Sequence, residues 1–136
     1  MKVLLIAIAV LALSSIAKAN LTSGELRANC EEAEKIHGDQ SGNGTLGGIC
    51  LGFIQGFVET LNLGMKNYIV ADGRVFAVTM QDGVTTGQMV RVYLKWITNH
   101  PEEENKPAIQ SLELALLESK LATSEMVGTF QPTPAK

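Results

Sequence analysis

Two cysteines, Cys30 and Cys50, are the side chains of this sequence best suited to covalent or metal chemistry. Such a pair can form a disulfide, share a metal ion, or include a catalytic thiolate. A metal site would need further ligands, and only His37 stands nearby in the sequence. A catalytic cysteine would need a paired base, and no pattern marks one. The disulfide is therefore favoured, with the other two as alternatives.

The segment between the cysteines partly resembles a calcium-binding loop. From Asp39 it runs D-x-S-x-N-G-x-L, with glycine at the sixth place and an apolar residue at the eighth. The twelfth place should hold a bidentate glutamate but holds Cys50, and Asp39 is the only charged ligand. We therefore expect a flexible polar turn here and no metal.

No familiar enzymatic motif is present. The sequence lacks G-x-S-x-G, H-E-x-x-H and a phosphate-binding glycine loop, and its two histidines stand far apart. Glu31, Glu32 and Glu34 fall on the polar face of a predicted helix, where water prevents them from acting as a matched acid and base. We expect no enzymatic activity and no cofactor.

The first 19 residues have the three parts of a secretory signal peptide. Lys2 supplies the positive charge, residues 3–13 the apolar core, and residues 17–19 a small-x-small cleavage site before Asn20. A retained membrane anchor is the alternative, for which the apolar run is short. Cleavage would give an exported, soluble, periplasmic protein of 117 residues with a net charge of −5. This acidity disfavours nucleic acids and anionic membranes as partners, and an oxidising compartment favours the disulfide.

Apolar residues at intervals of three and four predict four helices. The first helix begins near Thr22, the second spans 44–64, the third spans 86–99, and the fourth begins at Pro107. Thr22 and Glu25 have the spacing of a capping box, and Thr85 is a plausible cap for the third helix. A bridge from Cys30 to Cys50 would join the first helix to the second.

The helix predicted at 44–64 contains glycine at every fourth place. The row consists of Gly44, Gly48, Gly52 and Gly56. Glycine in a helix costs about 1 kcal/mol relative to alanine, so we expect another backbone to approach closely here. Packing within the molecule is the favoured interpretation, and pairing of two copies is the alternative. Gln55 and Glu59 interrupt the apolar character and disfavour a membrane span.

The remaining segments predict little regular structure. Two β-branched and aromatic runs flank Asp72-Gly73, a hairpin-type turn signal. Residues 67–83 are therefore expected to form an irregular loop or a short β-hairpin with an exposed tip. From about residue 123 the helical period fades, which predicts a flexible tail over 123–136. The predicted fold is all-α, a small four- to five-helix bundle over residues 20–122 with one disulfide.

Four pieces of sequence, in order, resemble the Tai-type (Rap/Tai) immunity family. Cys50-Leu-Gly-Phe-Ile-Gln-Gly matches C-x-G-[YF]-I-x-G, and Gly83-Val-Thr-Thr-Gly-Gln matches G-V-T-x-x-Q. His100-Pro-Glu and Pro107-Ala match H-P-E and P-A. The resemblance covers about residues 30–120. It implies a disulfide-held helical bundle that protects a bacterium from type VI secreted cell-wall amidases, often as a dimer, by inserting a surface element into the amidase cleft.

The resemblance also implies where the partner binds. The expected partner is a cell-wall amidase effector, with a homodimer as an additional possibility, and the expected contacts are Asp72, Arg74 and Asp82 around the exposed loop. Many family members carry a second cysteine pair, which this chain lacks at residues 76–79 and 117–120. The alternative function is a non-enzymatic periplasmic structural or stress-related module without an amidase partner.

Overall fold

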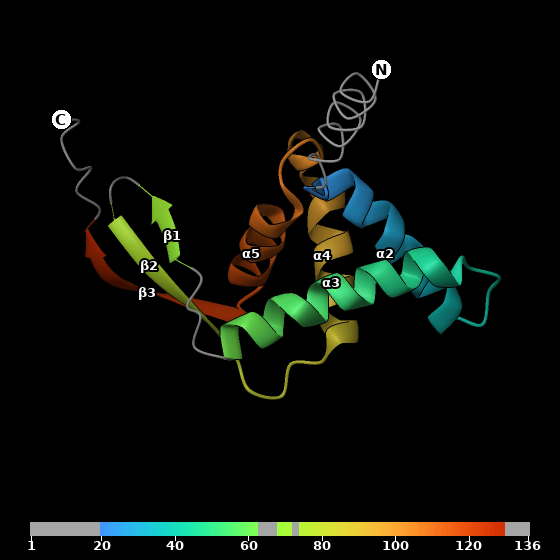
Figure 1. Ribbon diagram of the computed structural model, residues 1–136, viewed down its shortest axis with the longest axis horizontal. Coiled ribbons are helices and arrows are strands. Elements are labelled where there is room, and N and C mark those ends of the chain that lie inside the picture. The colour runs from blue at the N-terminus through green and yellow to red at the C-terminus, as the bar shows by residue number, and fades with distance from the viewer. Residues whose placement is uncertain (1–19, 63–67, 72–73, 130–136) are drawn as a thin grey trace, which may run out of the picture.

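The computed structural model describes residues 20–62, 68–71 and 74–129. The helices are α2 (Ser23–His37), α3 (Gly44–Asn62), α4 (Thr86–Asn99) and α5 (Ala108–Glu118), with a 3-10 turn, η1 (Pro101–Glu103). The strands are β1 (Tyr68–Ala71), β2 (Arg74–Met80) and β3 (Ala122–Thr129). Figure 1 shows the helices gathered in one body and the sheet extending from one side of it. The predicted signal peptide lies outside the described residues.

Two of the helices begin with capping boxes. Thr22 Oγ accepts the Glu25 N–H at 3.2 Å, while the Glu25 carboxylate accepts the Thr22 N–H at 2.8 Å and this bond lowers the pKa of Glu25. Thr85 and Gln88 repeat the arrangement at the start of α4. The predicted starts of α2 and α4 are confirmed, as is the mostly helical fold.

The predicted disulfide is confirmed. Cys30 and Cys50 are bonded, with their Cα atoms 5.0 Å apart, and both side chains are fully buried between α2 and α3. One turn earlier in α3, a Cβ added at Gly47 would lie 3.2 Å from Ala33 Cα. The two helices therefore meet backbone to backbone beside the bridge.

A buried polar cluster holds the other end of α2. The Ser23 hydroxyl lies 2.9 Å from the Lys106 carbonyl oxygen and 2.7 Å from the Ser111 hydroxyl. The Tyr93 hydroxyl donates to the Ser23 carbonyl at 2.8 Å. Burial raises the pKa of the Tyr93 phenol, so this donor stays protonated at physiological pH. The cluster ties the start of α2 to α4 and to the start of α5.

The apolar core lies where the four helices meet and continues into the root of the sheet. Its largest fully buried apolar side chains are Leu26, Ile54, Met89, Val90, Tyr93, Ile97, Leu112 and Leu116. Val78 of β2 and Ala122 of β3 belong to the same cluster. The sheet is therefore anchored to the helical body at this end.

The sheet is larger than predicted. β1 and β2 form an antiparallel hairpin from Tyr68↔Ala77 to Ala71↔Arg74, so of the two alternatives for residues 67–83 the hairpin is confirmed. β3 pairs with β2 along its whole length, with an irregularity between Val75 and Phe76. The predicted flexible tail is wrong for residues 123–129, because their backbone groups pair with β2. Residues 130–136 lie outside the described part.

The predicted close packing of the glycine row inside the molecule is also wrong. Nothing in the described structure lies within 4 Å of a Cβ added at Gly44, Gly48, Gly52 or Gly56. The core side of α3 is formed by Cys50, Ile54 and Phe57 instead. Gly44–Leu61 is long and apolar enough to cross a membrane by length and composition alone, and 22% of it is buried in this fold.

Removing the disulfide should destabilise the protein by about 3 kcal/mol, because a loop of roughly twenty residues regains its freedom in the unfolded chain. The variant is Cys30→Ala with Cys50→Ala, and urea unfolding followed by the fluorescence of Trp96, the only tryptophan, measures the change. Reduced wild-type protein is the control and should show a similar loss. An unchanged unfolding midpoint in both would contradict the prediction.

Candidate functional site

The three residues expected to contact a partner do not lie on one loop. Arg74 begins β2 and pairs with Ala71, while Asp72 lies between these two, outside the described residues. Asp82 follows the other end of β2, in the turn before α4, and is exposed. Eight residues of extended chain span roughly 26 Å. Arg74 and Asp82 therefore belong to opposite ends of the sheet.

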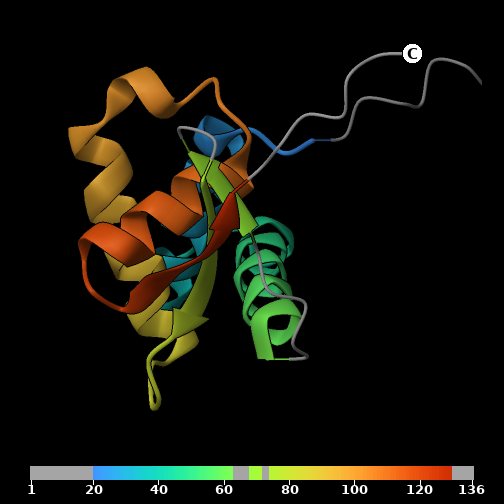
Figure 2. The ribbon, with the colours of Figure 1, turned by 90° about the vertical axis from the view of Figure 1, so that its left-hand side faces the viewer.

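The outer part of the sheet projects from the helical body in Figure 1, and in Figure 2 this side of the molecule faces the viewer, with the strands in front of the helices. We call it the β arm and define it as residues 68–71, 74–76 and 123–129. In β3 the first residue, Ala122, is buried and the following seven are exposed. Met126 and Val127 are 58% and 47% exposed, and Val127 is the extra residue opposite the irregularity in β2. The β arm thus offers apolar side chains on β3, a strand at the edge of the sheet.

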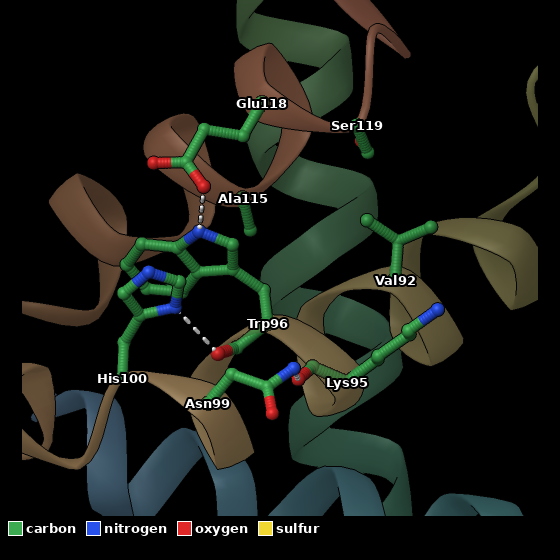
Figure 3. Close-up of a pocket in the computed structure, with 8 residues that line it drawn as sticks. All are labelled: Val92, Lys95, Trp96, Asn99, His100, Ala115, Glu118 and Ser119. Atoms are coloured by element: carbon green, nitrogen blue, oxygen red, sulfur yellow. Dashed lines mark hydrogen bonds between the residues drawn. The ribbon is translucent and has the colours of Figure 1, made fainter.

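A pocket of about 350 Å³ opens between the C-terminal ends of α4 and α5 (Figure 3). Its wall consists of Val92, Lys95, Trp96, Asn99 and His100 from α4 and its end, and of Ala115, Glu118 and Ser119 from α5 and its end. Its volume is at the lower end of the range for small-molecule sites.

The aromatic wall of the pocket is fixed by three contacts. Trp96 Nε1 donates to Glu118 Oε2 at 2.7 Å. The His100 ring stacks on Trp96, with centroids 4.2 Å apart and planes 18° from parallel. His100 Nδ1 lies 2.8 Å from the Trp96 carbonyl oxygen and therefore carries a proton there. Figure 3 shows both hydrogen bonds and the stack.

Ser119, His100 and Glu118 share this pocket but do not form a catalytic triad. Ser119 Oγ donates to the Leu116 carbonyl at 3.1 Å, whereas His100 and Glu118 both bond to Trp96. A triad would require the serine hydroxyl on the imidazole and the carboxylate behind it. Glu118 and His100 hold the wall, and Ser119 closes the end of α5.

In the segment that resembles a calcium loop, Asn43 caps the start of α3. Asn43 Oδ1 accepts the Thr45 and Leu46 N–H groups at the start of α3, and the Asn43 N–H donates to Glu32 at 2.6 Å. The Lys35 ammonium and this N–H lower the pKa of Glu32. Among the described residues, no group of three or more His, Cys, Asp or Glu side chains is placed to hold a metal ion.

The sequence did not indicate the pocket. Neither Trp96 nor Glu118 was expected to take part in a site, and His100 stood out only within the His100-Pro-Glu match. The spacing of Trp96 and His100 was the available signal, since residues four apart share a helix face. Glu118 gave no such signal, because it stands 22 residues from Trp96.

A family model described as Rap1a immunity proteins matches residues 22–119. This range includes the four helices, the disulfide, β1, β2 and every residue that lines the pocket. The comparisons with curated proteins and with solved structures gave no match.

Glu118→Ala should lower the free energy of unfolding by about 1 to 3 kcal/mol, because it leaves the nearly buried Trp96 indole N–H without its acceptor. Glu118→Gln keeps an acceptor oxygen and should stay within about 0.5 kcal/mol of wild type. Thermal and urea unfolding of the two variants measure the difference. Equal stability of both would show that this hydrogen bond does not hold the wall.

Proposed function

Because the chain belongs to the Rap1a family of immunity proteins, we propose that it binds a secreted cell-wall amidase and blocks the active-site cleft of that enzyme. The family supports an immunity role and a toxin as partner. The ordered motifs around Cys50, Gly83, His100 and Pro107, which resemble the Tai-type pattern, support the amidase and delivery by type VI secretion. The periplasm is the proposed compartment, since it holds the cell wall and allows disulfides to form.

The main support for this proposal is that the β arm projects from a helical body held by the Cys30–Cys50 disulfide. An inhibitor that occludes a cleft needs a projecting element whose position is fixed before binding, because ordering it afterwards costs affinity. Ala77, Val78 and Ala122 bury the root of the sheet, whereas residues 123–129 are exposed. We propose that the β arm makes the cleft contact, with Arg74 at its outer end and Asp72, two residues earlier in the sequence, as a further contact. Asp82 would meet a different part of the partner.

The open face of α3 supports a second proposal, that two copies of the chain pair through it. Gly48, Gly52 and Gly56 leave space above the helix, and Ile49 and Leu51 beside them are 45% and 43% exposed. Residues 44–58 carry no charged side chain. Two copies can therefore meet over residues 44–58 without burying a charged side chain from this part of α3.

Apolar grooves flank this face on both sides. One of about 480 Å³ is lined in part by Ile49, Phe53 and Ile109, and one of about 230 Å³ in part by Ile36 and Leu51. Large apolar side chains of a second copy would fill them. The pairing would place two β arms on one dimer.

Protection by the β arm can be tested with Met126→Glu and Arg74→Glu. Each should reduce rescue from a periplasm-directed amidase and weaken binding by about tenfold or more, because a charge is added or reversed in the contact. Leu114→Glu on α5, where Leu114 is 39% exposed, is the matched control and should protect like wild type. Growth after co-expression and titration calorimetry are the measurements.

Two outcomes of that experiment would count against the proposal. Full protection by both β-arm variants would remove the β arm from the contact. Lysis of cells that express correctly folded wild-type protein with every candidate amidase would remove the amidase as partner.

Pairing across α3 predicts opposite effects of Gly52→Leu on stability and assembly. The substitution should stabilise the isolated fold by up to about 1 kcal/mol, because leucine favours helix and meets open space. The same side chain should block close approach of two helices and give the monomer mass by light scattering. Thr98→Leu, at an exposed polar place on α4, is the control. A monomer mass for wild type at about 100 μM would contradict the pairing.

A further inference from the structure

Three acceptor atoms in the pocket between α4 and α5 have unused capacity in the described part of the chain. Glu118 accepts from Trp96 through Oε2, and within the described part of the chain its Oε1 accepts no hydrogen bond. His100 Nδ1 donates to the Trp96 carbonyl, and in the described residues its Nε2 makes no hydrogen bond. Asn99 donates through Nδ2 to the Lys95 carbonyl, which leaves Oδ1 as an acceptor. The pocket therefore suits a group rich in N–H donors.

The surroundings of these acceptors favour a positive charge on that group. α4 ends at Asn99 and α5 at Glu118, so the negative ends of two helix dipoles meet at the pocket. The stacked rings of Trp96 and His100 form a wall on which a planar cation can lie. The contacts that fix this wall exist before any ligand arrives, which limits the ordering cost of binding.

Lys95 is the one cation in the pocket wall, and it does not neutralise Glu118. In Figure 3 its ammonium points away from the Glu118 carboxylate. No ion pair joins these two side chains in the part of the chain that the structure describes. Lys95 is exposed, so its side chain can remain in water when another cation enters. An incoming cation therefore breaks no existing ion pair.

The pocket lies next to the root of the sheet. Ser119, on its rim, precedes the first residue of β3, Ala122, by three residues, which is at most about 11 Å of chain. A partner that covers the β arm is therefore close enough to place a side chain in the pocket. The acidic sequence, with a net charge of −3, also favours a partner with basic groups on its surface.

From this geometry we infer that the pocket receives one basic side chain, an arginine or a lysine, of the toxin partner. The N–H groups of this side chain donate to Glu118 Oε1 and its plane or stem lies on the wall formed by Trp96 and His100. The inference rests on the proposed function, because the toxin supplies the side chain.

The chemistry of the pocket can be tested without the toxin by titrating N-acetyl-arginine amide into the labelled full chain. The single indole N–H signal of Trp96 should shift and saturate in the millimolar range. N-acetyl-citrulline amide, which has the same shape without the charge, should cause no saturable shift. Glu118→Gln should weaken the arginine response by about tenfold or more. No saturable shift with arginine, or equal shifts with both probes, would overturn the inference.

The contact with the toxin is tested by comparing Glu118→Gln with Glu102→Gln. Both remove one negative charge, but Glu102 is exposed on η1 and does not line the pocket. Glu118→Gln should raise the Kd of the toxin complex about tenfold and Glu102→Gln less than twofold. Equal losses with a tightly bound wild-type complex would overturn this inference alone. Absence of wild-type binding to any candidate amidase would overturn the proposed function, and the inference with it.

Discussion

The buried disulfide between Cys30 and Cys50 determines how the helices can be arranged. It fixes the rotation of α3 about its axis, so that Gly47, Ile54 and Phe57 face inwards with Cys50. The cluster around Ser23 holds the other end of α2 against α4 and the start of α5. With α2 held at two places, the remaining helices close around it, and the core they form anchors the root of the sheet.

Features that depend on near neighbours could be predicted from the sequence. The two capping boxes need only residues three apart, and the proline and glycine positions mark where helices stop. The third strand could not be predicted in this way. β3 is exposed on both faces beyond Ala122, so residues 123–129 show no alternation of apolar and polar side chains. Their structure comes from pairing with β2, about 50 residues earlier in the chain.

The disulfide of Cys50 explains why the glycine row of α3 does not pack inside the molecule. A helix turns about 100° per residue, so positions two residues from Cys50 lie about 200° away from it. Gly48 and Gly52 are those positions, and they must face outwards once Cys50 is buried in a disulfide. Gly47, three residues from Cys50, lies on the buried side and makes the close contact with Ala33. The disulfide therefore turns the row towards solvent, or towards a second copy.

The pocket brings together an imidazole, a carboxylate and a hydroxyl, yet its geometry suits recognition better than catalysis. In a triad the free imidazole nitrogen accepts the proton of a hydroxyl, and here the Ser119 hydroxyl donates to the Leu116 carbonyl while Glu118 and His100 Nδ1 bond to Trp96. The bonds to Trp96 and the stack of His100 on its ring give the wall a fixed shape. Trp96 uses only one oxygen of Glu118, so this fixed wall near the root of the sheet keeps an acceptor for a ligand. Such an arrangement contributes to binding through complementarity, because the cost of ordering the pocket has already been met during folding.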